Sequence, residues 1–236
     1  MANVPVNQLL SQERALQLKE LITDRANAIK DLKIPELPRV FSGDTTYITV
    51  ADKYGNMVSL IESNYLPFGS GYTVAGFPLQ DRGALFSLNP QSPNSLEPNK
   101  RPFHTLIPAL VTRNGRPWLS FGVMGGSTQP QGQTEVLINL IDFGMNLQAA
   151  ADALRIIHSG PAGADGAPPS GFVYAEDGFS QDVLNGLSSR GHVFLKPDAP
   201  FRLKYTGGFQ GIIRDPVTGV YSGASDARKD GVAIGY

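Results

Sequence analysis

The alternation of apolar and polar positions along the chain predicts two β-hairpins. Apolar or β-branched residues fill 46–50 and 57–61, and the intervening residues 52–56 have turn chemistry. Two further runs, 105–113 and 116–123, flank an Asn-Gly pair that favours a tight hairpin turn. We therefore expect two antiparallel pairs of strands.

Helical periodicity appears in other parts of the chain. Residues 11–32 follow a capping residue, Ser11, and place apolar side chains on one face. Residues 134–143 and 146–157 show the same spacing on either side of Gly144. The pattern is completed by a short helix near 181–190 and by strands near 192–196, 208–214 and 219–222. This mixture predicts an α+β fold.

Proline and glycine separate these elements. They interrupt residues 34–44, which we expect to form an exposed connector, and residues 160–170, which we expect to form a loop. Residues 62–102 are irregular over a length that, in a compact domain, usually carries function. Functional residues are therefore expected at the connector and in this long loop.

Composition excludes several classes of function. The chain has 236 residues, 41% of them hydrophobic, and a formal net charge of −1, which argues against nucleic-acid binding. It has no cysteine and only three scattered histidines, so a metal site is not expected. No membrane-spanning stretch or signal peptide is visible, and the compartment stays open. The expected partner is a small molecule or another protein.

Thr45 stands at the start of the first predicted strand, directly after the connector. A threonine acts as a nucleophile when it is the first residue of a chain, because its free α-amine takes the hydroxyl proton. Such an amine has a pKa of roughly 7.7 to 8.0, which suits a base near neutral pH. Catalysis by Thr45 therefore requires a cut between Asp44 and Thr45. The plain alternative is a threonine that only begins a strand.

Several runs, in order over nearly all of residues 44–236, resemble the γ-glutamyltranspeptidase family of N-terminal nucleophile hydrolases. The matching runs are Asp44–Tyr47, Asp52–Asn56, Phe68–Gly71, Lys100–Pro102, Gly125–Ser127, Asp142–Asn146 and Gly223–Arg228. Any one of these runs is a weak signal, whereas the ordered set is specific.

The resemblance implies a four-layer αββα sandwich, of which this chain forms about half. Members of the family are precursors that cleave themselves before a threonine into a large and a small subunit. We therefore expect residues 1–44 to be the tail of the large-subunit region with the processing linker. Residues 45–236 are then the small-subunit catalytic region, inactive without the large subunit as its heterodimer partner. The resemblance implies no cofactor.

The same resemblance assigns the catalytic groups. Thr45, rather than Thr46, is the implied nucleophile, and Ser63 occupies the place of a second hydroxyl that hydrogen-bonds it. Gly125 and Gly126 follow a strand and precede a helix, which suits backbone N–H groups that stabilise an oxyanion. Taken alone, Ser63 is an ordinary surface serine and the glycine pair is a turn.

The substrate-binding positions depart from the family pattern. His104 and Thr105 replace two serines that hold a substrate carboxylate, although both can still donate hydrogen bonds. His104 also changes charge with pH, and a structural histidine is the alternative. Tyr65 takes the place of an asparagine in the amine site, with Asn64 adjacent to it.

Arg82 departs most from that pattern, because it stands with Leu85 where transpeptidases have an amide and an acidic side chain for the α-amino group. A guanidinium repels an ammonium group and pairs well with a carboxylate. We therefore expect Arg82 to hold a terminal carboxylate. This resembles the acylase-like branch of the family, which includes proteins named for glutaryl-type acylation.

The sequence thus predicts an amide hydrolase or acyltransferase in which Thr45 attacks a γ-glutamyl or glutaryl-type amide, with hydrolysis favoured over transfer. One alternative is an authentic glutathione γ-glutamyl hydrolase or transpeptidase, with Asn64 and Gln80 contacting the amine. The other is an unprocessed, non-catalytic half that acts as a binding module.

Overall fold

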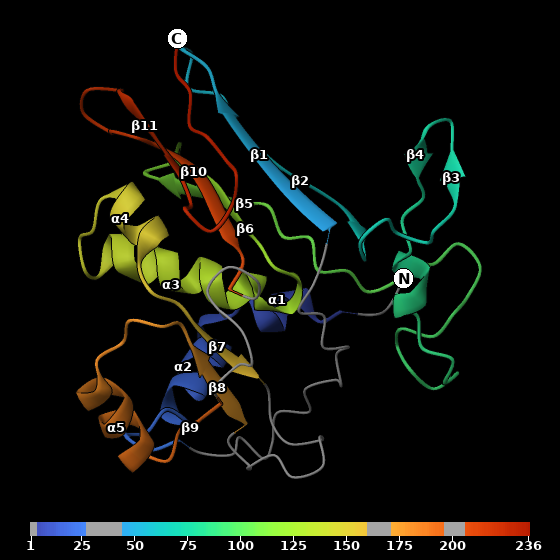
Figure 1. Cartoon of the computed structure of the whole chain (residues 1–236), viewed down its shortest axis with the longest axis horizontal. Coiled ribbons are helices and arrows are strands. Elements are labelled where there is room, and N and C mark those ends of the chain that lie inside the picture. Colours follow the sequence, from blue (N-terminus) through green and yellow to red (C-terminus); the bar gives the residue numbers. More distant parts are fainter. Residues whose placement is uncertain (1–3, 27–43, 160–170, 196–205) are drawn as a thin grey trace.

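The structure, a computed structural model, describes residues 4–26, 44–159, 171–195 and 206–236. A four-stranded sheet contacts helices α3 (Gln129–Ile141) and α4 (Leu147–Asp152) on one face. The hairpin of β1 (Asp44–Ala51) and β2 (Met57–Tyr65) packs on the other face (Figure 1). This order of layers, helices, sheet and second sheet, agrees with the predicted α+β class and forms part of a four-layer sandwich.

The central strand β6 (Arg116–Met124) explains this layering, because its side chains alternate between the two faces. The side chains that face the helices join Val136 and Leu147 in the main core; they are Leu119, Phe121 and Val123. The intervening residues contact the hairpin; they are Ser120, Gly122 and Met124. Both faces of β6 are covered, so the strand is buried without a break from Leu119 to Met124.

The four-stranded sheet is antiparallel throughout. Its order is β11 (Tyr221–Ser225), β10 (Gly208–Arg214), β6 and β5 (Ala109–Arg113). The hairpin of β5 and β6 turns at Asn114 and Gly115, both with positive φ, as the sequence predicts. Asp52 stabilises the turn between β1 and β2, where its carboxylate accepts from the amides of Tyr54 and Asn56 at 2.9 and 3.0 Å.

The remaining elements are short. They are α1 (Val6–Leu9), α2 (Gln12–Glu20), β3 (Thr73–Val74), β4 (Phe77–Pro78), the 3₁₀ turns η1 (Arg82–Leu85) and η2 (Gly126–Thr128), β7 (Ile156–Ser159), β8 (Phe172–Ala175), α5 (Gln181–Ser189) and β9 (Val193–Phe194). Strands β7, β8 and β9 form a three-stranded sheet, with α2 and α5 nearby in Figure 1.

Two helices are shorter than their periodicity predicts. The helix expected over 11–32 begins at the predicted cap but ends at Glu20, and Thr23 then accepts a hydrogen bond from the Arg25 amide; residues 27–32 lie outside the described residues. The helix expected over 146–157 ends at Asp152. The Arg155 amide donates to the Glu176 carboxylate instead of a helical carbonyl. A tertiary contact therefore replaces helix with strand β7.

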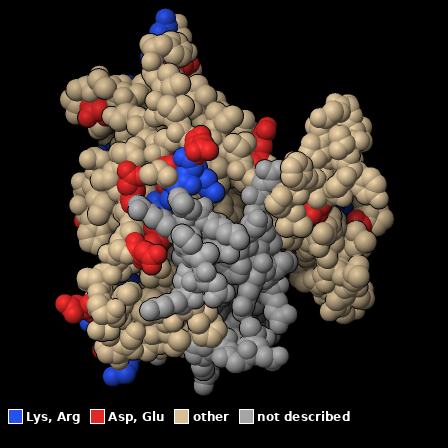
Figure 2. All heavy atoms as spheres, in the orientation of Figure 1, with Lys and Arg blue, Asp and Glu red and all other residues tan. Residues whose placement is uncertain are grey.

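Much of the surface is uncharged. In the face shown in Figure 2, the largest group of Lys and Arg atoms lies near the centre with Asp and Glu around it, smaller groups lie at the edges, and most other visible atoms belong to uncharged residues. Many large apolar side chains of the described residues are exposed, including Ile48, Val50 and Val58 of the hairpin. None of the described helices is long and apolar enough to cross a membrane.

Candidate active site

Thr45 and Ser63 meet at the open end of the β1–β2 hairpin. The two residues are cross-strand partners, and the Thr45 hydroxyl donates to Ser63 Oγ at 2.9 Å. The Tyr65 amide donates to the same serine oxygen at 2.9 Å. The register shifts between Asp44 and Thr45, so the regular ladder begins at Thr45. The sequence-predicted hydroxyl pair is therefore in direct contact, with Ser63 as the acceptor.

The hairpin lies on β6 in a fixed register. Thr49 Oγ1 donates to Ser120 Oγ at 2.7 Å, and two residues earlier the Tyr47 ring covers Gly122. A Cβ on Gly122 would lie 2.5 Å from that ring, so only glycine fits beneath it. The two strands therefore run in opposite directions here, so that a residue two positions earlier in β1 lies over a residue two positions later in β6.

The next step of this register brings Thr45 to the level of Met124, which packs in one cluster with Tyr47. Gly125 and Gly126 follow Met124 directly and have φ values of 152° and 60°. The Gly125 carbonyl accepts from the Thr128 amide at 3.2 Å and hydroxyl at 2.8 Å. The fold therefore places the glycine pair at the end of β6 that lies beside the end of β1.

Gly207 supports this turn from the neighbouring strand. It precedes β10, has φ of 77°, and packs so closely that a Cβ on it would lie 2.1 Å from the Met124 carbonyl oxygen. A Cβ on Gly125 would in turn lie 3.0 Å from the Gly207 Cα and 2.5 Å from the Thr128 hydroxyl. The backbone at Gly125 is therefore held by contacts that leave no room for a side chain.

A buried network of charges lies behind Gly207. Arg228 donates to Glu176 through Nε at 2.7 Å and through Nη2, and its Nη1 lies 3.1 Å from Asp226. Arg155 pairs with the other oxygen of Asp226 at 2.7 Å. Thr206, the neighbour of Gly207, donates to Glu176 at 2.5 Å. All five side chains are almost completely buried.

The network is electrostatically balanced, with two arginines and two carboxylates. Burial alone would raise the pKa of Glu176, but hydrogen bonds from Arg228, Thr206 and the Arg155 amide outweigh it and lower that pKa. Arg155 also donates to the Thr206 carbonyl at 3.2 Å. The charges thus anchor both the side chain and the main chain of the residue before Gly207.

This network is a part of the site that residue patterns do not reveal. Arg228 and Asp226 belong to a run that matched the family, but no role followed from it, and Glu176 gave no signal at all. Three of the contacts that hold Glu176 and Arg228 join residues 21, 52 and 77 positions apart, so only the fold brings these groups together. The one available signal was the presence of charged residues in otherwise apolar surroundings.

Arg82 and Tyr65 lie together where β2 ends, two residues beyond Ser63. Tyr65 is the last residue of β2, has φ of 79°, and its ring centroid lies 5.5 Å from the Arg82 guanidinium carbon. Arg82 is 8% exposed, and among the described residues neither of its terminal nitrogens has a hydrogen-bond partner. Burial lowers the pKa of Arg82, which neighbouring Tyr65 and Asp81 partly offset.

The loop that carries Arg82 is fastened to the end of β2. The Asp81 amide donates to the Asn64 carbonyl at 3.1 Å, and the Asp81 carboxylate accepts from the Leu66 amide at 3.2 Å. Gln80 accepts from the Arg82 amide at 2.6 Å. Asn64 therefore contributes its main chain to this contact, and its half-buried side chain remains available beside Ser63.

His104 and Thr105 lie on the segment before β5. His104 is exposed and its Nδ1 accepts from the Leu106 amide at 3.1 Å, while Leu106 packs against Tyr47 and Met124. This packing brings the segment near the hairpin. Within the described residues, however, no hydrogen bond joins His104 or Thr105 to the other candidate residues. The same residues contain no group of three His, Asp or Glu side chains that could hold a metal ion.

Comparison with known proteins gives a consistent result. The family model described as Gamma-glutamyltranspeptidase matches residues 1–236. The glutathione hydrolase-like YwrD proenzyme of Bacillus subtilis is 35% identical over 99% of this chain and 42% of its own length. The oxamate amidohydrolase proenzyme of Klebsiella pneumoniae is 34% identical over the same shares. The chain therefore spans less than half the length of these relatives.

Solved structures agree. The cephalosporin acylase from Bacillus halodurans matches with a TM-score of 0.81 and 39% identity, over 99% of this chain and 40% of that one. A chain of the gamma-glutamyltranspeptidase from Pseudomonas nitroreducens matches with a TM-score of 0.68 and 29% identity. That match covers 81% of this chain and 99% of the other.

Proposed function

This chain belongs to the gamma-glutamyltranspeptidase family, and from that premise we propose that it carries the nucleophile of an amide hydrolase. Thr45 becomes that nucleophile when the bond between Asp44 and Thr45 is cut. The observation that carries the proposal is the 2.9 Å hydrogen bond between the hydroxyls of Thr45 and Ser63. A nucleophile needs an oriented hydroxyl, and this contact orients it.

The reaction follows from these groups. The free amine of Thr45 accepts the hydroxyl proton as Oγ1 attacks the amide carbonyl, and the backbone N–H groups of Gly125 and Gly126 stabilise the oxyanion. Collapse breaks the C–N bond, the leaving amine takes the proton, and an ester on Thr45 remains. Water then attacks the ester and releases the acid, with the same amine as base. An acceptor amine in place of water gives transfer.

Two comparisons support a cut at Thr45. The Pseudomonas nitroreducens chain is matched almost end to end by 81% of this chain, which is about the length of residues 45–236. The relatives from Bacillus subtilis and Klebsiella pneumoniae are both named proenzymes. On this proposal, residues 1–44 belong to the large-subunit region, and a large subunit is the partner of residues 45–236.

Arg82 is the group that we propose for acyl-group selection. A buried guanidinium without an acceptor is unfavourable unless an anion meets it, and a carboxylate suits its fork geometry. The proposed donor is therefore an amide whose acyl group ends in a carboxylate. The names of relatives refer to glutathione, oxamate and cephalosporins, so the acyl group is the feature of the substrate that most needs testing.

The cut is tested by mass spectrometry of the protein that contains this chain. We expect a fragment that begins at Thr45, and no such fragment from Thr45→Ala. Thr46→Ala is the matched control and keeps the cut. Amide hydrolysis by a protein in which Asp44 and Thr45 remain joined would overturn the proposed nucleophile and favour another role for this half.

The acyl group is tested with three anilides: glutaryl, γ-glutamyl and uncharged butyryl. We expect Arg82→Ala to raise KM for the glutaryl anilide at least tenfold and to leave KM for the butyryl anilide unchanged. Unchanged KM for both charged substrates would remove Arg82 from the site. Faster wild-type turnover of the γ-glutamyl than of the glutaryl anilide would favour an authentic glutathione hydrolase.

A further inference from the structure

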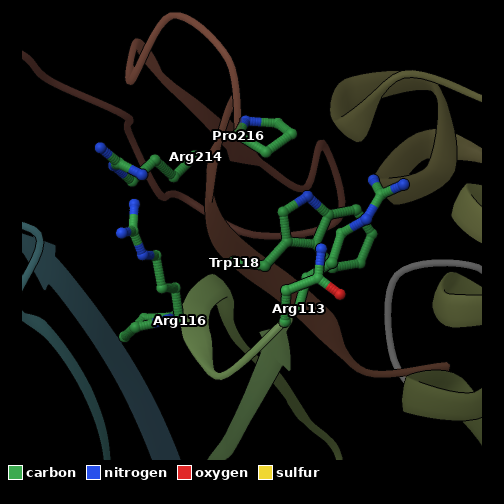
Figure 3. Close-up of a pocket in the computed structure, with 7 residues that line it drawn as sticks. Arg113, Arg116, Trp118, Arg214 and Pro216 are labelled. Carbon is green, nitrogen blue, oxygen red and sulfur yellow. The ribbon is translucent and has the colours of Figure 1, made fainter.

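A pocket at the far end of β6 gathers three arginines around the only tryptophan of the chain. The cavity has a volume of about 350 Å³, within the range of small-molecule sites. Its arginines are Arg113 from β5, Arg116 from β6 and Arg214 from β10, and Trp118 forms a wall between them (Figure 3). Three neighbouring strands thus contribute one guanidinium each.

These guanidinium groups form no salt bridge within the described parts of the chain, although, after the hydrogen bond from the Thr218 amide, the charge of Arg214 helps to lower the pKa of nearby Asp215. None of the three guanidinium groups has a carboxylate within ion-pair distance there, although Asp215 adjoins Arg214 in sequence. The Asp215 carboxylate instead accepts from the amides of Val217 and Thr218 at 2.9 and 2.7 Å. The pocket therefore keeps a concentrated positive charge.

The arrangement does not serve the stability of the hairpin. Arg113 and Arg116 are directly opposite each other across the β5–β6 turn, and like charges at such positions destabilise a sheet. The Arg113 guanidinium has a favourable contact of its own, 5.9 Å from the centroid of the Trp118 ring. An anion bound between the arginines would offset the repulsion.

A β-bulge places Trp118 in this pocket. Leu119 pairs with Val111 and Pro117 pairs with Thr112, so Trp118 is the extra residue of β6. Bulges redirect side chains and are frequent beside functional sites. In Figure 3 the Arg116 and Arg214 side chains extend on one side of the indole, and the Arg113 guanidinium lies on the other.

We propose that this pocket binds a small molecule with two anionic groups, carboxylates or phosphates, held chiefly by Arg116 and Arg214. Guanidinium groups bind both kinds of oxyanion in bidentate geometry, so the shared chemistry is the oxyanion pair. Arg116, at the pocket, and Gly125, at the proposed active site, lie at opposite ends of β6. Nine residues separate them, which along a strand corresponds to about 30 Å. The ligand of this pocket is therefore additional to the proposed amide substrate.

Trp118 is itself the probe for this site, because the 236-residue chain contains no other tryptophan. Its fluorescence is followed while the whole chain is titrated with pyrophosphate, with succinate, and with neutral succinamide. We expect a saturable change with at least one of the two dianions, weakened by raised salt, and none with succinamide. The dianion that binds more tightly identifies phosphate or carboxylate chemistry.

Variants assign the response to the arginines. We expect the double variant Arg116→Gln with Arg214→Gln to weaken binding at least tenfold, and Arg190→Gln, at the end of α5, to leave it unchanged. Arg116→Lys with Arg214→Lys keeps the charge and tests the fork geometry if the glutamine variant does not fold. No saturable change with either dianion, or equal affinity in the arginine variants and the control, overturns the proposal.

Discussion

At the scale of single residues, Ser63 has two tasks that are hard to separate. Its hydroxyl oxygen accepts from Thr45 and from the Tyr65 amide, so it holds the proposed nucleophile and the strand end that carries the Arg82 loop. A change at Ser63 therefore alters both the attacking group and the binding residues. Kinetic changes at this position report on the two together.

Glu135 predicts a pH dependence of stability. Burial raises the pKa of its carboxyl to about 7, although Arg155 and Arg228 act against this shift; Glu176 adds to it. The folded pKa exceeds that of an unfolded glutamate, so the protonated carboxyl of Glu135 stabilises the folded state. This contribution to the free energy of unfolding is complete below about pH 4.5 and is lost as pH rises through 7. The loss amounts to about 3 kcal/mol.

Glu135→Gln keeps an acceptor for the Ile156 amide and removes the ionisation. We expect the variant to gain stability relative to the wild type between pH 5 and pH 8, measured by urea unfolding. Glu62→Gln, on the exposed side of β2, is the surface control. A constant difference between Glu135→Gln and the wild type across this range would show that burial does not raise the pKa of Glu135.

At the scale of elements, the turn after β6 depends on the start of β10. Gly207 touches the Met124 carbonyl and the Gly125 backbone, and the residue before it is fixed by Arg155 and Glu176. The candidate oxyanion turn is thus held by a strand more than 80 residues later in sequence. Its geometry belongs to the sheet rather than to the loop.

Gly207→Ala tests this dependence against Gly144→Ala. Both glycines have positive φ, 77° and 64°, so alanine costs about 1 kcal/mol at either position. At Gly144 the new Cβ meets open space, whereas at Gly207 it would lie 2.1 Å from the Met124 oxygen. We expect Gly207→Ala to lower kcat for amide hydrolysis and to destabilise the fold by more than Gly144→Ala does, and Gly144→Ala to leave kcat unchanged. Equal changes in kcat and in stability for the two variants would contradict the dependence of the turn after β6 on Gly207.

Elements with local signals were predictable. Both hairpins, the Ser11 cap and the Asn114-Gly115 turn depend on neighbouring residues and were found from sequence. The predicted end of the helix over 146–157 was wrong, because α4 ends at Asp152 and Arg155 instead pairs with charged residues from distant segments. For the site, the Thr45 and Ser63 contact was predicted from the family resemblance, while the support from Gly207 needed the tertiary structure.

At the scale of the whole molecule, one face of the β1–β2 hairpin has no cover within the described residues. Two cross-strand pairs form an apolar patch there, Ile48 with Leu60 and Val50 with Val58, each residue 43 to 56% exposed. The other face packs on β6. Because relatives are more than twice as long as this chain, we expect the remainder of such a protein to cover the patch.

Val58→Asp tests that expectation, because it places a charge in the patch and leaves the β6 side unchanged. We expect the variant to lose co-purification with the remaining part of the protein. Val217→Asp, in an exposed turn, is the control and should retain it. Retention by both variants would mean that the patch is not the contact.

The register shift between Asp44 and Thr45 has a consequence for the chain after a cut. The bond that would break lies at the irregularity, and the seven pairs from Thr45 to Ala51 remain intact. New chain ends normally fray, but this one would stay in its ladder, with its hydroxyl still bonded to Ser63. On the other side of the cut, Asp44 keeps a single pair, with Tyr65, beyond the register shift. The new amine would therefore be held more firmly than the released carboxyl end, and the nucleophile would stay in place beside Ser63 after the cut.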